Sequence, residues 1–198
     1  MNISYQPEIF EFNTEQCLKV KKILACYPQD RKASAVLPLL DLAQRQSGGW
    51  LPRAAMDHVA EILEMAKIRV YEVATFYTMF NLEPVGEHVV QICTTTPCEL
   101  RGAGSIMKTV REEIGVGPGE TSKDGKFTLL EVECLGACVN APMMQIGDYY
   151  YEDLDEISTR KILQAFRRGE TPDPGPQNGR KGSEPVEGLT TLTHLTRG

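Results

Sequence analysis

The fold of this chain is decided by residues 88–114, HVVQICTTTPCELRGAGSIMKTVREEI. The apolar run 88–94 predicts a short buried strand, and Cys93 and Cys98 lie in the turn at its end. The apolar residues that follow recur at helical spacing and predict an amphipathic helix over 99–115. The stretch therefore predicts a strand, a cysteine-bearing turn and a helix in direct succession.

The same strand-and-turn arrangement returns in residues 127–142, FTLLEVECLGACVNAP. The run 127–133 predicts a second strand that ends at Cys134, and Cys138 follows in the next turn. Four thiols delivered in two pairs can surround a metal centre without closing a disulfide framework. The sequence therefore predicts a metalloprotein.

Two kinds of metal centre suit four cysteines in pairs. The spacing of the cysteines favours an iron–sulfur cluster, and residues 94–96 add hydroxyl and backbone donors for its sulfurs. A structural zinc ion accepts paired thiols as well. A disulfide redox enzyme would show Cys-x-x-Cys, whereas four and three residues lie inside these pairs. A Rieske centre is excluded because His58, His88 and His194 do not stand beside the cysteines.

Other segments complete an α+β arrangement. Residues 143–146 and 149–151 predict a hairpin whose tyrosines lie on the surface, and residues 155–168 predict a helix with acids at its start and arginines at its end. The proline and glycine content of residues 171–198 predicts an extended tail. Three leucines of this tail are candidates for docking on a partner, namely Leu189, Leu192 and Leu195.

The first half of the chain has helical periodicity. Asn13 and Gln16 resemble a capping box at the start of one helix, and apolar spacing predicts a second helix over 34–46. A third begins near Pro52, and the ambiguous stretch 69–80 favours helix over strand. Two further cysteines, Cys17 and Cys26, are predicted to be packing or surface residues of the first helix. The predicted division is a helical region over 1–84, an α/β domain over 85–170 and the tail.

Composition and charge exclude several classes of function. The 198 residues carry a net charge of −6, which argues against binding to nucleic acid or to anionic membranes. No window has the roughly 18 apolar residues of a membrane span, and the N-terminus lacks a signal-peptide pattern, so we expect a cytoplasmic protein. No phosphate loop or nucleophile motif is present, which predicts no catalytic residues and no site for NADH or a flavin on this chain.

Three blocks of sequence resemble one family. VYEVATFYTMF (70–80), ICTTTPCELRG (92–102) and ECLGACVNAP (133–142) closely resemble the 24 kDa subunits of respiratory complex I, the NADH:quinone oxidoreductase, whose bacterial members are the E chains. The similarity extends nearly over the whole chain and includes GLTTLT (188–193) in the tail. Similar subunits occur in NAD-linked hydrogenases and formate dehydrogenases, so the resemblance leaves the complex open.

The resemblance implies a helical N-terminal region joined to a thioredoxin-like domain with one [2Fe–2S] cluster. By motif position, Cys93 and Cys98 would bind one iron, and Cys134 and Cys138 the other. The implied partner is a flavoprotein subunit that holds FMN, binds NADH and carries a [4Fe–4S] cluster. The implied location is the cytoplasmic side of the inner membrane, or the matrix side in a mitochondrion. A zinc-stapled scaffolding module is the alternative from a different functional class.

The charge around the cysteines predicts the electron affinity of such a cluster. Its four thiolates give it a negative charge that reduction increases. Glu99, Glu131 and Glu133 lie beside the cysteines in the sequence and would oppose reduction. We therefore expect a low-potential centre.

Overall fold

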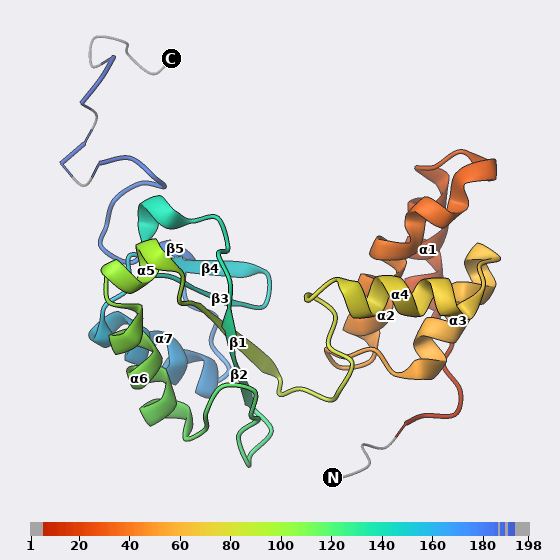
Figure 1. Ribbon diagram of the computed structural model, residues 1–198, viewed down its shortest axis with the longest axis horizontal. Helices are drawn as coiled ribbons and strands as arrows, with labels where there is room; N and C mark the ends of the chain where they lie inside the picture. The colour runs from red at the N-terminus through yellow and green to blue at the C-terminus, as the bar shows by residue number, and fades with distance from the viewer. Residues whose placement is uncertain (1–5, 186, 189, 193–198) are drawn as a thin grey trace. The chain divides into compact units, whose positions relative to one another are not determined.

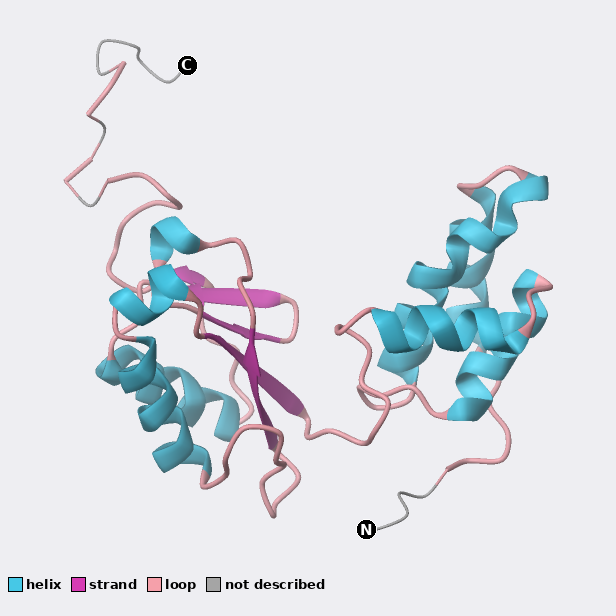
Figure 2. Cartoon of the chain, in the orientation of Figure 1, coloured by secondary structure: helices cyan, strands magenta, loops and turns pink. Residues whose placement is uncertain are grey.

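A computed structural model describes residues 6–185, 187–188 and 190–192. Its contacts divide the chain into two compact units, Met1–Val85 and Gly86–Gly198. The first unit is built from helices, and the second combines a mixed sheet with helices (Figure 2). The predicted α+β class with an N-terminal helical region is confirmed.

The first unit packs its helices around an aliphatic core. Its elements are α1 (Thr14–Ala25), the 3-10 helix η1 (Gln29–Ala35), α2 (Val36–Gln46), α3 (Arg53–Leu63) and α4 (Lys67–Phe76) (Figure 1). The core is centred on fully buried side chains of α2 and α3, among them Leu39, Leu40, Val59 and Ala60. The helical interpretation of 69–80 holds as far as Phe76, where Tyr77 takes an extended backbone conformation.

The start of α1 is held differently from the predicted capping box. Asn13 Oδ1 accepts a hydrogen bond from the Gln16 amide at 2.9 Å, as expected. The Asn13 amide, however, donates to Gln46 Oε1 at 3.0 Å, and in the described part of the chain no donor reaches the buried Gln16 Oε1. Gln46 also donates to the Glu11 carbonyl at 2.8 Å. A side chain of α2 therefore completes the cap and fastens α1 to it.

Cys17 on α1 and Cys26, the residue directly after this helix, are both exposed. Each thiol donates to a nearby carbonyl, Cys17 to Phe12 and Cys26 to Lys22, both at 3.3 Å. The inward position of this helix is taken by Val20. Of the two predicted alternatives, packing or surface, both cysteines are therefore surface residues.

The second unit is organised by a five-stranded sheet in the order β2-β1-β3-β4-β5. Its strands are β1 (His88–Cys93), β2 (Phe127–Val132), β3 (Met144–Ile146), β4 (Tyr149–Glu152) and β5 (Gly175–Pro176). β1 runs parallel to β2 and antiparallel to β3, and β3 and β4 form the predicted hairpin. The parallel strands β1 and β2 therefore have their carboxyl ends at the same edge of the sheet.

Two helices pack against the sheet through one shared core. These are α6 (Ala103–Ile114) and α7 (Glu156–Arg167), which lie side by side (Figure 1). Alternate residues of each strand point toward these helices. Val90 and its two partners across the sheet, Ile146 and Leu129, are buried in this shared core. Tyr151 belongs to this core and is fully buried, so the expectation that all three tyrosines lie on the surface is wrong for this one.

The helix predicted over 99–115 is interrupted. A short α5 (Thr96–Leu100) carries Cys98, and α6 begins after Gly102, whose φ of 99° lies in the left-handed region. That conformation costs little for glycine and ends the first helical turn. Cys98 is therefore inside a helical turn of its own, whereas the sequence had placed it before a single helix.

The C-terminal segment contacts the rest of the second unit through β5 and through Arg180. Gly175 pairs with Tyr151 and Pro176 with Glu152, so β5 extends the sheet. Leu189 and Leu195 lie outside the described residues, and Leu192 is exposed. Within the described ranges, no helix is both long and apolar enough to cross a membrane.

Candidate metal centre

The sheet brings the two cysteine-bearing loops to one edge. Cys93, the last residue of β1, lies opposite Val132, the last residue of β2. Because the strands are parallel, both loops leave the sheet at its carboxyl edge, which is where open α/β sheets place their sites. Cys134 follows Val132 by two residues. Parallel pairing therefore joins two motifs that lie far apart in the sequence.

The first pair of thiols is buried. Cys93 and Cys98 are each 1% exposed and pack with Ala103, Ala141 and Met143 in a small cluster of their own. The Thr95 hydroxyl lies 3.2 Å from Cys93 Sγ. A strand end and a helical turn thus hold both sulfurs in place, with a hydroxyl beside them as the sequence predicted.

The second pair is exposed. Cys134 Sγ and Cys138 Sγ lie 3.4 Å apart, and the Gly136 amide donates to Cys134 Sγ at 3.4 Å. Gly136 has a φ of 84°, so the turn requires a residue that enters the left-handed region readily. Cys138 begins a single 3-10 turn, η2 (Cys138–Asn140). Both thiols face solvent at the end of a short loop.

The pKa values of the first pair respond to burial and to hydrogen bonds. Burial raises the pKa of Cys93, but hydrogen bonds from Thr95, Cys98 and the Leu135 backbone outweigh it and lower this pKa overall. Burial raises the pKa of Cys98 to about 12, with further contributions from Cys93 and from the charge of Cys138. Of the two thiols, Cys93 therefore has the lower pKa and loses its proton more readily.

The two cysteine loops meet, because Leu135 and Ala137 of the second loop pack against the cluster that contains Cys93 and Cys98. The pKa of Cys138 responds to this arrangement. It is raised first by the hydrogen bond with Cys134 and then by partial desolvation, and the negative charges of Cys134 and Cys93 add to the effect. Cys93 belongs to the other loop, so the two pairs are close enough for their charges to interact. A bound cation would reverse this mutual destabilisation and favour all four thiolates.

The donor set fits a thiolate-bound metal centre. All four thiols are free, the Thr95 hydroxyl lies beside Cys93 Sγ, and the Gly136 amide donates to Cys134 Sγ. Within the described residues, no group of three or more His, Cys, Asp or Glu side chains is arranged to hold one metal ion. The thiols therefore stand as two neighbouring pairs.

Three predicted acids flank this edge at different positions. Glu131 Oε1 accepts a hydrogen bond from the Thr94 hydroxyl at 2.8 Å, which ties the end of β2 to the first loop. Glu99 and Glu133 are exposed. All three acids lie in the segments that carry the cysteines, and their opposition to reduction of a bound cluster stays a prediction.

Sequence reasoning missed the residues that support the second loop. The Tyr150 hydroxyl donates to the Leu135 carbonyl at 2.9 Å, and the Asn140 side chain is buried. Asn140 Nδ2 donates to Asp153 Oδ2 at 3.2 Å and to the Gly182 carbonyl at 2.9 Å. The polar Asn140 directly after an exposed turn was the available signal, but its partners lie 13 and 42 residues away.

A family model and several relatives match this chain. The model for thioredoxin-like [2Fe-2S] ferredoxins matches residues 20–167. The chain is 55% identical over 183 residues to NADH dehydrogenase [ubiquinone] flavoprotein 2, mitochondrial, of Dictyostelium discoideum, covering 92% of this chain and 74% of the relative. It is 56% identical over 158 residues to the E chain of the NADH-quinone oxidoreductase of Rickettsia bellii, covering 80% of this chain and 95% of the relative.

Among solved structures, the fold is similar to part of an NAD+-reducing [NiFe]-hydrogenase in the air-oxidized state. The TM-score is 0.57 at 16% sequence identity, over 66% of this chain and 23% of the hydrogenase chain. At this identity the likeness concerns the fold alone.

Proposed function

The chain belongs to the thioredoxin-like [2Fe-2S] ferredoxin family, and from this membership we propose that it is the electron-transfer subunit of an NADH–quinone oxidoreductase. Its relatives at more than 50% identity are subunits of that oxidoreductase. The observation that carries the proposal is the meeting of the two cysteine loops at the carboxyl edge of β1 and β2. The family implies an iron–sulfur cluster, and this edge is where the chain would hold it.

We assign Cys93 and Cys98 to one iron and Cys134 and Cys138 to the other. Two adjacent pairs match a centre with two ligands per iron, whereas zinc takes four ligands at one ion. When bound, such a cluster takes up and releases one electron at a time. The chain contributes the thiolates, the Thr95 and Gly136 donors that offset charge on sulfur, and a buried first loop that limits access of water.

The proposed partner is a flavoprotein subunit that holds FMN, binds NADH and carries a [4Fe–4S] cluster. The exposed side of the second loop is the side from which a partner's flavin would exchange electrons with this chain. We place the chain peripherally on the cytoplasmic side of the membrane, as a subunit of the complex. An equivalent matrix location applies to a mitochondrial form.

One purification tests the assignment. The full chain is purified anaerobically, its iron and acid-labile sulfide are quantified, and the EPR spectrum of the reduced protein is recorded. We expect about two irons and two sulfides per chain and a rhombic signal from the reduced centre. Stoichiometric zinc with no signal would instead establish the scaffolding alternative. Replacing the exposed Cys17 and Cys26 by alanine is the matched control and should leave both measurements unchanged.

The partner is tested separately. The cluster-loaded chain is mixed with the flavoprotein subunit and NADH, and the reduced EPR signal is followed under anaerobic conditions. We expect the signal to appear only when flavoprotein and NADH are both present. A signal that stays absent although the two proteins co-purify would refute electron exchange with that partner.

A further inference from the structure

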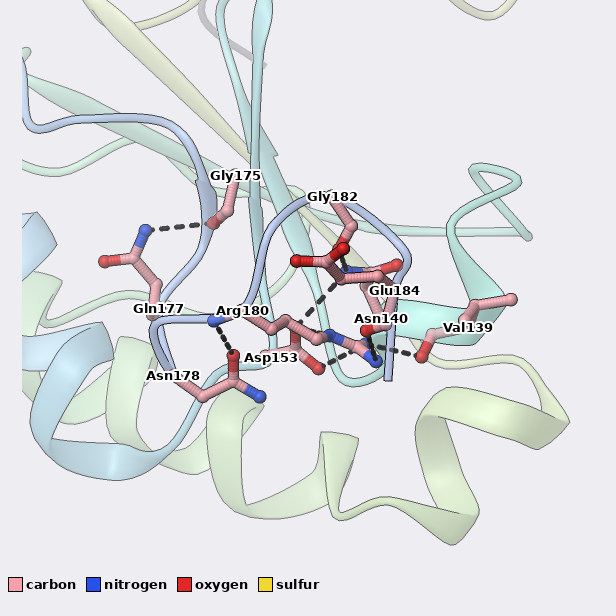
Figure 3. Close-up of polar contacts among 9 residues, drawn as sticks. All are labelled: Val139, Asn140, Asp153, Gly175, Gln177, Asn178, Arg180, Gly182 and Glu184. Carbon is pink, nitrogen blue, oxygen red and sulfur yellow. Dashed lines mark hydrogen bonds and ion pairs between the residues drawn. The ribbon is translucent and has the colours of Figure 1, made fainter. Parts of the chain in front are cut away.

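The turn that carries Cys138 is fastened from outside by the C-terminal segment. Figure 3 shows the guanidinium group of Arg180 directed at Asp153 and at the Val139 carbonyl. Arg180 Nη2 donates to the Val139 carbonyl oxygen at 2.6 Å. Val139 is the residue directly after Cys138. A residue 41 positions away thus bonds the peptide unit between Val139 and Asn140, one residue beyond a candidate ligand.

The next residue of the turn is held in the same way. Asn140 Nδ2 donates to the Gly182 carbonyl at 2.9 Å and to Asp153 Oδ2 at 3.2 Å. The Asp153 amide donates back to the Asn140 carbonyl at 2.8 Å. The turn itself is a single 3-10 turn with few bonds of its own. Its position is therefore set mainly by Asp153 and by the C-terminal segment.

Arg180 and Asp153 form a bidentate salt bridge that is largely shielded from water. Nε and Nη2 of Arg180 each donate at 2.7 Å, to Oδ2 and Oδ1 of Asp153 respectively. Both side chains are only 9% exposed. A two-pronged contact of this kind fixes direction as well as distance, because the guanidinium group is planar. The third contact of the same group, to Val139, therefore has a defined geometry.

The segment that delivers Arg180 is itself anchored. Its upstream end is β5, and the Gln177 amide continues the pairing by donating to the Glu152 carbonyl at 2.9 Å. The Arg180 amide donates to Asn178 Oδ1 at 3.1 Å, which shapes the turn between the strand and the arginine. Residues 175–184 themselves lie beyond residues 20–167, the stretch matched by the family model.

We propose that residues 175–184 form a strap that positions the second pair of cluster ligands, with Arg180 as its positioning residue. The proposal rests on the proposed function, since it takes Cys134 and Cys138 as ligands. The first pair needs no such device because β1 and α5 hold it within the buried core. The second pair lies on an exposed turn. Its two sulfurs therefore depend on the strap to keep their positions relative to the first pair.

Substitution of Arg180 should have a different effect if its ion pair only stabilises the fold than if it positions the cysteine turn. Loss of a stabilising pair lowers the unfolding temperature of the whole unit. Loss of a positioning pair changes the cluster itself, because the Cys138 turn gains freedom while the sheet and the first pair remain in place. The matched control is Arg160, which pairs with Glu112 and Glu113 at 2.7 and 2.8 Å in the same unit but does not contact the cysteine turn.

The experiment compares Arg180→Gln with Arg160→Gln in the full, cluster-loaded chain. The readouts are the rate at which a chelator removes iron, the width of the reduced EPR signal and the unfolding temperature of the metal-free protein. We expect Arg180→Gln to lose iron about ten-fold faster than Arg160→Gln, in line with lost supporting contacts at metal sites, and to give a broadened signal. Equal rates and equal spectra in the two variants would overturn the proposal.

A second variant covers the case in which Arg180→Gln fails to fold. Arg180→Lys keeps a cation beside Asp153 but lacks the planar fork that reaches Val139 at the same time. We expect it to fold, and to lose iron faster than Arg160→Gln. A folded Arg180→Lys protein with the wild-type rate and spectrum would overturn the proposal. A wild-type chain that takes up no iron and sulfide would overturn the proposed function, and the strap proposal with it.

Discussion

The two cysteine loops of the second unit achieve the same task by different means. Cys93 and Cys98 are held by a strand end and a helical turn and are almost completely buried. Cys134 and Cys138 lie on an exposed turn and are supported by contacts from Tyr150 and from distant residues of the C-terminal segment. One pair of the candidate site is therefore built into the core of the fold, and the other pair lies on a turn at its surface.

Because of this difference, a substitution near one loop should affect the stability of the fold, and a substitution near the other should affect only the geometry of the candidate site. Changes near the first loop act on the packed core and should affect folding as well as the site. Changes near the second loop leave the core intact and should act on the site alone. Four predictions test this distinction, from the largest expected effect to the smallest.

The largest effect follows from removing one ligand of each pair. Cys98→Ala and Cys138→Ala should both abolish the cluster, because each takes a thiolate from one iron. They should differ in the metal-free state, where Cys98→Ala lowers the free energy of unfolding by about 1 kcal/mol and Cys138→Ala leaves it unchanged. Iron and sulfide analysis measures the first effect and urea denaturation the second. Equal unfolding curves would contradict the contrast between the loops.

Thiol accessibility gives the next largest effect. In the metal-free chain, Cys134 and Cys138 should react with a maleimide at least about ten-fold faster than Cys98, whose sulfur is buried and becomes accessible only through local opening. Mass spectrometry of peptides sampled over time resolves the individual sites. The exposed Cys26 serves as an internal reference for a free surface thiol. Similar rates at Cys98 and Cys26 would show that the first loop is open.

Acid should weaken the sheet that carries the first loop. His88 at the start of β1 packs between Phe127 and Phe166, and burial lowers its pKa, with Lys126 adding to the shift and Glu87 opposing it. A histidine with a lowered pKa stabilises the fold above its unfolded-state value of about 6.5, and this contribution is lost as the pH falls through the folded value.

Denaturation of the metal-free protein between about pH 7 and pH 5 measures this effect. The free energy of unfolding of the second unit should fall with pH in the wild type and fall less steeply in His88→Gln. His58→Gln, a change in the first unit, is the control and should keep the wild-type slope. An unchanged slope in His88→Gln would assign the acid sensitivity to other groups.

The smallest effect concerns the reduction potential. Glu99 lies directly after Cys98 and is exposed, so Glu99→Gln removes a negative charge beside the first pair and should raise the potential modestly. Glu87→Gln is the distance control, since Glu87 precedes β1 and lies a strand length of about 20 Å from Cys93. A redox titration monitored by EPR compares the three proteins. A fall in the potential of Glu99→Gln would contradict the electrostatic argument.

Much of the second unit follows from local sequence patterns. The strands ending at Cys93 and beside Cys134, the β3–β4 hairpin and α7 all lie where apolar periodicity and turn residues predicted them. Asp155 caps α7 and its capping box with Ser158 is complete. These features depend on residues within a few positions of one another, so the sequence contains the information directly.

Other features depend on residues that only folding brings together. The helix predicted over 99–115 breaks at Gly102, and the inward position of Tyr151 follows from its pairing with Met144 and its packing on Phe166. The glycine- and proline-rich composition of the C-terminal segment gave no sign of β5 or of Arg180. Composition describes average packing and does not identify a single buried ion pair.

The sequence by itself determined that two strand-and-turn motifs each present a pair of cysteines, because apolar alternation and thiol spacing are local properties. Only the tertiary structure decided that the pairs meet, since that requires β1 and β2 to lie parallel and in register. It also decided that one pair is buried and that Arg180, 41 residues away, bonds the carbonyl of Val139 beside the other pair. Burial and long-range hydrogen bonds exist only after the chain has closed on itself, which is why the pattern of residues did not reveal them.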